Sequence, residues 1–151
     1  MTSEEQLLSF ARAGDEAGVR LLLSDDEDGD LDINATDRDG LSSLLLAVQG
    51  SYRGVVRLLL EAQPDTEVTD SDGNTALLLA VQQGDVPIVR MLLRAESDKD
   101  AGNYSGRTAL MVAADAGDEV LVRLLLHEDA NVDAIDNDGK TALELAREQG
   151  H

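Results

Sequence analysis

The strongest constraint on the fold of this chain is a short motif that recurs every 33 residues. Its clearest copy is Asp-Gly-Asn-Thr-Ala-Leu-Leu-Leu-Ala at residues 72–80. The equivalent residues of the four copies are Gly40, Gly73, Gly106 and Gly139; Ser42, Thr75, Thr108 and Thr141; Leu44, Leu77, Leu110 and Leu143; and Ala47, Ala80, Ala113 and Ala146. A fixed period of this length is typical of an array in which each unit packs on its neighbours, and it argues against a single closed core.

Each copy of the motif predicts a turn followed by two helices. An Asp side chain at the turn can accept hydrogen bonds from nearby backbone amides, and the glycine can adopt a positive φ. The turn sequence Asp-x-Asp-Gly stands at 37–40, 70–73 and 136–139. The hydroxyl that follows predicts an N-cap for a short first helix. A second apolar cluster, such as residues 55–60, indicates a longer helix with a wide buried face. The residues expected to end the first helices are Ser51, Gly84 and Gly117.

This pattern closely resembles the ankyrin repeat family over nearly the whole chain. The family's unit reads Gly-x-Thr-Pro-Leu-His-x-Ala-Ala, then a turn and a Val-x-x-Leu-Leu helix, in the register found here. The family's proline is replaced by Ser43, Ala76, Ala109 and Ala142, and its histidine by Leu45, Leu78, Met111 and Glu144. The resemblance implies an all-α ankyrin-repeat solenoid of helix-turn-helix units with β-turn or hairpin tips. Apolar contacts are expected where the family has a histidine-centred polar network.

The register divides one domain into five consecutive segments. Residues 1–38 are predicted to form an N-terminal capping repeat, which opens with the capping box Thr2-x-x-Glu5 and carries an acidic loop at 24–32. Regular repeats are predicted at 39–71, 72–104 and 105–137, and a partial C-terminal or capping repeat at 138–151. The acidic loop is either an inert insertion, which we favour, or a contact for a basic partner. The last helix is polar, as expected for a terminal cap whose outer face is exposed to solvent. A boundary within a longer array would equally explain why the repeat pattern stops there.

The chain is strongly acidic, with a net charge of −19. A field of that sign repels nucleic acid and anionic membranes and attracts basic proteins or peptides. General solubility or adaptation to high salt would favour the same composition. The chain has no cysteine, no apolar run near the ~20 residues of a membrane helix, and no signal-peptide pattern. We therefore predict a cytoplasmic or nuclear monomer that binds neither nucleic acid nor membrane.

The sequence predicts no enzyme, no cofactor and no metal site. Residues 134–141 end in Gly-Lys-Thr like a phosphate-binding loop, but Ala134 stands at the first required glycine and no strand is expected before it. The acidic segment 24–35 resembles a calcium loop without its final glutamate. The two histidines, His127 and His151, offer no paired zinc ligands. Carboxylates are abundant, and most are expected to lie on solvated faces.

The resemblance implies that a partner binds on the concave face formed by the turn tips and the first helices. Carried over position by position, the tip residues are Arg38, Asp39, Leu41, Ser71, Asp72, Asn74, Tyr104, Ser105, Arg107, Asn137, Asp138 and Lys140. The helix-end residues are Gln49, Gln82, Gln83, Asp115 and Ala116. Tyr104 is a candidate aromatic anchor, unless its ring lies on the neighbouring turn. Arg107 and Lys140 are expected to add positive points to an acid-rich surface.

These observations favour a non-catalytic interaction module that binds a protein or peptide, and the acidity favours a basic one. Two other functions are compatible with the sequence. The chain could be a structural or regulatory segment of a longer ankyrin array in a multidomain protein. It could also be a small-ligand or oligonucleotide sensor, for which Arg38, Tyr104, Arg107 and Lys140 are the available residues; the overall charge argues against this reading.

Overall fold

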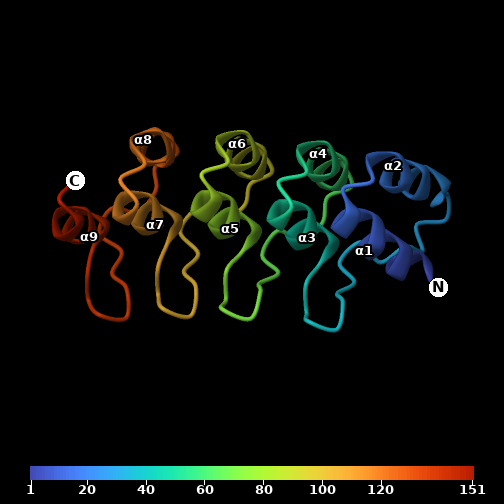
Figure 1. Cartoon of the computed structure of the whole chain (residues 1–151), viewed down its shortest axis with the longest axis horizontal. Coiled ribbons are helices and arrows are strands. Elements are labelled where there is room, and N and C mark those ends of the chain that lie inside the picture. The colour runs from blue at the N-terminus through green and yellow to red at the C-terminus, as the bar shows by residue number, and fades with distance from the viewer.

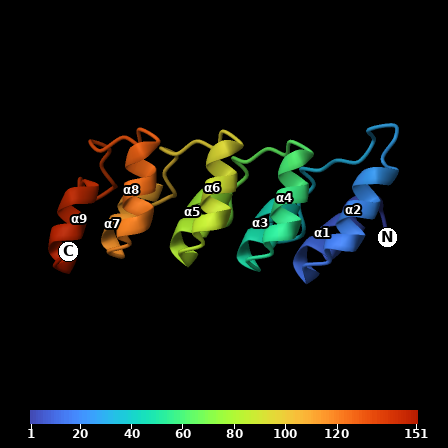
Figure 2. The same cartoon turned by 90° about the horizontal axis from the view of Figure 1, so that it is seen from above.

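Two parallel rows of short helices run the length of the molecule in the computed structural model, which describes all 151 residues (Figure 1). The inner row contains α1 (Ser3–Ala13), α3 (Ser43–Gln49), α5 (Ala76–Gln83), α7 (Ala109–Asp115) and α9 (Ala142–Gln149). The outer row contains α2 (Glu16–Asp25), α4 (Arg53–Glu61), α6 (Val86–Arg94) and α8 (Glu119–His127). The turn tips hang below the inner row in Figure 1, and the view from above shows the helix pairs side by side (Figure 2). The all-α solenoid expected from the 33-residue period is confirmed.

The inner helices begin where the repeated hydroxyl groups stand. The Oγ atoms of Ser42, Thr75, Thr108 and Thr141 each accept a hydrogen bond, at 3.3 to 3.4 Å, from the backbone amide three residues later. A cap of this kind contributes about 1 kcal/mol, because it satisfies a donor that the first helical turn leaves free. The expected capping box at Thr2 and Glu5 is present at the start of α1. The N-caps predicted from the motif are therefore confirmed.

The turns between the two helices of a unit use left-handed backbone conformations. Gly84 and Gly117 have φ angles of 70° and 66°, and Ser51 adopts a φ of 54° at the equivalent place. The outer helices then begin with an aspartate where one is available: the side chain of Asp85 accepts a hydrogen bond from the amide of Ile88 at 3.2 Å. Pro87 lies in the first turn of α6, as expected, where it lacks only an amide hydrogen that has no helical partner.

The core is a continuous apolar layer between the two rows, built from the same positions of successive units. Leu44, Leu77 and Leu110 are 1%, 1% and 3% exposed. The residues that replace the family's histidine, Leu45, Leu78 and Met111, are each 1% exposed, so apolar contact is confirmed at these positions. Full burial of such a side chain contributes about 1.5–3 kcal/mol. The apolar stabilisation is therefore spread along the array and has no single centre.

Polar side chains in the loops after the outer helices also join successive units. Asn34, Glu67 and Asp100 stand at the same position of three units, and each accepts a hydrogen bond from a backbone amide of the next unit. The donors are the amides of Asp65, Asp98 and Asn131, at 2.7, 3.0 and 2.7 Å. Part of the chain's acidity therefore has a structural role in stacking.

The acidic loop near the N-terminus is shorter than the sequence predicted. The helix α2 continues through Asp25, so two residues of the predicted loop at 24–32 are helical. The side chain of Asp26 accepts a hydrogen bond from the amide of Leu31 at 3.1 Å. Asp28 and Asp30 are exposed.

Candidate functional site

Four turn tips of the same construction line one edge of the molecule. In each, the side-chain oxygen of the first residue accepts hydrogen bonds from the amides two and four residues later, at 2.8 to 3.1 Å. These first residues are Asp37, Asp70, Asn103 and Asp136. The glycine at the fourth position donates its amide to the carbonyl of the first residue and has a φ between 73° and 78°. Each tip is thus internally braced, and its two central residues project into solvent.

The central tip residues are the exposed part of the predicted site. All eight are exposed: Arg38, Asp39, Ser71, Asp72, Tyr104, Ser105, Asn137 and Asp138. Three of the tips are also joined to one another. The amide of Tyr104 donates to the carbonyl of Asp72 at 3.0 Å, and the amide of Asn137 donates to the carbonyl of Ser105 at 3.0 Å. The side chain of Asn137 adds a hydrogen bond to the Tyr104 carbonyl at 2.8 Å. The tips from 71 to 138 therefore form one strip.

Tyr104 lies on the neighbouring turn and is still exposed. A Cβ atom added at Gly73 would lie 2.5 Å from Cδ1 of the Tyr104 ring, so the ring covers that glycine. The side chain nevertheless remains 71% exposed. The two interpretations of Tyr104 offered by the sequence are compatible, because one face of the ring packs on the turn while the rest is available.

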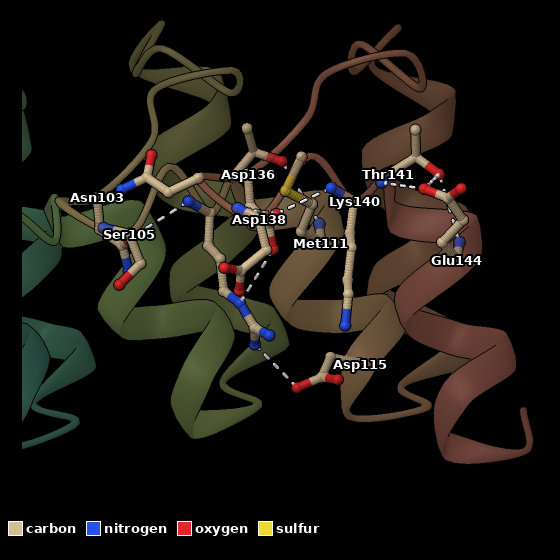
Figure 3. A network of polar contacts seen from close by, with 12 residues as sticks. Asn103, Ser105, Met111, Asp115, Asp136, Asp138, Lys140, Thr141 and Glu144 are labelled. Atoms are coloured by element: carbon tan, nitrogen blue, oxygen red, sulfur yellow. Dashed lines mark hydrogen bonds and ion pairs between the residues drawn. The ribbon is translucent and has the colours of Figure 1, made fainter.

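Arg107 is held in a charge network and is not a free positive point on the surface. Figure 3 shows three members of this network, Asp115, Asp136 and Lys140. Its Nη1 lies 3.0 Å from Oδ2 of Asp115, and its Nε lies 3.9 Å from Oδ2 of Asp136. Gln149 donates to the other oxygen of Asp115 at 3.2 Å. The sequence predicted that Arg107 adds a positive point to an acid-rich surface; in the structure this charge is paired with Asp115.

The same network includes Lys140, whose Nζ lies 2.8 Å from Oε2 of Glu148. This hydrogen bond and the charge of Glu148 raise the pKa of Lys140. The Lys140 amide donates to the carboxylate of Asp136 at 2.9 Å, which is the main cause of the lowered pKa of Asp136. Asp138 donates a second backbone hydrogen bond, and the charges of Arg107 and Lys140 act in the same direction. Lys140, like Arg107, is already paired.

Several of the predicted tip and helix-end residues are engaged in hydrogen bonds within the array. Asn74 is 5% exposed, and its Oδ1 accepts hydrogen bonds from Gln82 at 3.2 Å and from Asn103 at 3.0 Å. The side chain of Gln83 donates to the carbonyl of Gln49 at 3.0 Å. We therefore remove Asn74 from the set of residues that a partner could contact. Leu41 is half-buried, while Gln82, Gln83 and Ala116 remain exposed.

One exposed apolar residue beside the last tip was missed by the sequence analysis. Ile135 is 61% exposed and immediately precedes Asp136. The other units have Thr36, Thr69 and Gly102 at this position. Alignment of the units, followed by a search for apolar residues where the others are small or polar, would have identified it.

No three His, Asp or Glu side chains converge in a way that could hold a metal ion. None of the nine helices combines the length and the apolar character that crossing a bilayer requires. This face presents exposed side chains on internally braced turns, beside the row of inner helices.

The comparison with known proteins identifies one matching family. A family model described as "Ankyrin repeats (3 copies)" matches residues 7–103 and again residues 95–151. A search of curated proteins finds none with significant similarity to the chain.

Proposed function

Because the chain belongs to the ankyrin repeat family, whose repeats generally act as protein–protein interaction modules, we propose that it binds a protein or peptide partner on its tip strip and inner helices. The observation that carries the proposal is the row of eight exposed tip residues on turns that are braced internally, three of which are also joined to one another. A surface that is ordered before binding loses less conformational entropy when a partner docks.

The charge of the turn tips supports a basic partner. Asp39, Asp72 and Asp138 occupy the same position of three tips, and their carboxylates have no hydrogen-bond or ion-pair partner within the protein. They differ in this from the first aspartate of each tip, whose carboxylate is used by the turn itself. Unpaired carboxylates at equivalent positions of three tips would steer a basic segment toward the tips and orient it there.

The pairing of Arg107 and Lys140 removes support from the oligonucleotide interpretation. A phosphate backbone is bound by several free cations, and these two are engaged with Asp115 and Glu148. Ankyrin repeats typically bind partners without catalysing a reaction. We extend that role to this chain and expect its partner to leave the complex chemically unchanged.

The proposal is tested by affinity capture with variants of the immobilised chain. Asp72→Arg and Tyr104→Ala change exposed side chains that make no side-chain hydrogen bond, so both variants should fold. We expect each to lose the proteins that the wild-type chain retains at low salt. Retention of the wild-type partner should also fall as salt is raised, if the unpaired carboxylates steer it.

Asp28→Arg is the matched control, because it makes the same change of charge in the acidic N-terminal loop, outside the four turn tips. This variant should retain the partner. If Asp28→Arg alone loses the partner, binding occurs at the acidic loop. If all three variants retain it, binding occurs on neither surface and the proposal is wrong.

A further inference from the structure

The most exposed aromatic ring of the chain lies on the tip strip. The chain has only three aromatic residues, Phe10, Tyr52 and Tyr104. Phe10 is half-buried and Tyr52 is 36% exposed, whereas Tyr104 is 71% exposed. An aromatic surface is therefore offered to a partner at one tip of the array.

The position of this ring is set by the two neighbouring tips. The amide of Tyr104 donates to the carbonyl of Asp72 at 3.0 Å, and the carbonyl of Tyr104 accepts from the side chain of Asn137 at 2.8 Å. The ring lies over Gly73, where an added Cβ atom would be 2.5 Å from Cδ1 of the ring. Because glycine has no Cβ atom, the ring can occupy this place without a clash.

The tips on either side of Tyr104 each carry an unpaired carboxylate. Asp72 belongs to the preceding tip and Asp138 to the following one. Neither carboxylate forms an ion pair, since the basic residues of the strip, Arg107 and Lys140, are paired with other carboxylates. The middle of the tip strip therefore combines one exposed aromatic ring with two negative charges that no group of the protein neutralises.

This combination favours a side chain that is both flat and positively charged. An anion would be repelled by the two carboxylates, and an apolar side chain would remove water from them without pairing them. A lysine ammonium is a point charge, whereas an arginine guanidinium is planar, stacks on aromatic rings and donates two parallel hydrogen bonds to a carboxylate. Arginine is therefore the side chain that matches the ring and a carboxylate together.

We propose that Tyr104 and Asp72 form a subsite for an arginine side chain of the partner protein. The guanidinium stacks on the Tyr104 ring and donates to the Asp72 carboxylate, while Asp138 adds attraction from the following tip. This subsite rests on the function proposed above, and it specifies which residue the basic partner presents to the tip strip.

The experiment compares three synthetic peptides of equal length that differ in one residue type. Each carries arginine, lysine or the neutral arginine analogue citrulline at the same positions of a glycine–serine background. NMR titrations of the isotope-labelled chain measure both the affinity and the place of binding. The arginine peptide should shift the amide signals of 71–74 and 104–107 and bind about two- to fivefold more tightly than the lysine peptide, as an exposed stacking contact predicts. The citrulline peptide should leave these signals unchanged.

The ratio of the arginine affinity to the lysine affinity separates the subsite from general attraction to an acidic surface. Tyr104→Leu removes the aromatic ring and should abolish the ratio, whereas Tyr104→Phe keeps a ring and should preserve it. Asp72→Asn removes the charge with little change of shape and should weaken the arginine peptide more than the lysine peptide.

Gly73→Ala and Gly40→Ala form a matched pair, because alanine meets a φ of 78° or 77° at the two positions. At Gly73 the added Cβ atom displaces the Tyr104 ring, so the affinity ratio should fall. At Gly40 nothing lies within 4 Å of the Cβ atom, and the ratio should stay at the wild-type value. Equal ratios in the two variants would mean that the place of the ring over Gly73 does not matter for binding, which would overturn the subsite.

Three other results would overturn the proposal: equal affinities of the arginine and lysine peptides for the wild-type chain, a ratio that survives Tyr104→Leu, or signal shifts confined to residues outside the tips. Equal affinities with shifts at the tips would still agree with a basic partner on the tip strip. The affinity capture described above tests that function separately, so the two failures can be told apart.

Discussion

Adding one methyl group to the glycine of a turn tip should destabilise the chain by an amount that depends on the neighbouring unit. Gly40, Gly106 and Gly139 have φ angles of 77°, 73° and 76°, so alanine meets the same left-handed backbone at each. That conformation costs an alanine about 1–2 kcal/mol. Alanine also restricts the unfolded chain more than glycine does, but this effect is similar at every tip and cancels in a comparison.

The surroundings of the added Cβ atom differ between the tips. At Gly40 and Gly139 nothing lies within 4 Å of it. At Gly106 it would lie 2.7 Å from Oδ1 and 3.0 Å from the backbone nitrogen of Asn137, and 3.2 Å from the backbone carbon of Asp136. Those backbone atoms belong to the next tip, and they cannot move without disturbing the hydrogen bonds that brace it. Overpacking of this kind costs about 1–3 kcal/mol more.

We therefore expect Gly106→Ala to lower the free energy of unfolding by about 2–5 kcal/mol, the sum of the left-handed cost and the overpacking cost. Gly40→Ala and Gly139→Ala should each cost only about 1–2 kcal/mol. Gly73→Ala should resemble them, because the Tyr104 ring that it meets is 71% exposed and can swing aside. Urea denaturation followed by circular dichroism measures all four. If Gly106→Ala is no more destabilising than Gly40→Ala, the close contact between successive tips is absent in solution.

Three further predictions concern buried and paired polar groups. Because the pKa of Asp136 is lowered in the folded state, its charged form adds stability at neutral pH that is lost as pH falls below about 4. Asp136→Asn, which copies Asn103, should therefore be less stable than wild type at pH 7, with the difference in urea midpoint shrinking toward pH 3; a constant difference would contradict the shift. Ser97→Ala should raise the free energy of unfolding by about 1 kcal/mol, because the Ser97 hydroxyl is buried without a hydrogen-bond partner; thermal unfolding that shows a loss would mean that the hydroxyl is satisfied. Asp100→Ala should cost about 1 kcal/mol in urea denaturation, since Asp100 accepts a hydrogen bond from the next unit at 2.7 Å; no loss would mean that this link is not formed.

The features predicted correctly from sequence are those set by a few neighbouring residues. Thr75 caps α5 because its hydroxyl reaches an amide three residues away, and the adjacent Gly73 permits the positive φ that its turn requires. The 33-residue period repeats these local rules in register, so the helix order and the stacking follow from them. Leu45 and Leu78 could replace a polar residue because both positions lie in the buried apolar core.

The features that sequence reasoning missed depend on contacts between residues that are distant in the sequence or in neighbouring units. Asn74 looks like an exposed tip residue, but Asn103, 29 residues away, covers and binds its side chain. Arg107 looks like a free cation until the fold places Asp115 and Asp136 near it. Leu143 carries the same letter as three buried leucines, and its exposure is known only when the order of the outer helices is known. In a repeat array, the exposure and the pairing of a side chain depend on its surroundings as much as on the residue itself.

Hydrogen–deuterium exchange on the chain, with and without the partner recovered by affinity capture, tests the central claim most directly. If the tips and inner helices hold the partner, exchange should slow at 71–74, 104–107 and 137–140, with α4 and α6 unchanged. The mass of the recovered partner should also be unaltered. Slower exchange confined to the outer helices would contradict binding on this face. A partner whose mass has changed would contradict binding without chemistry.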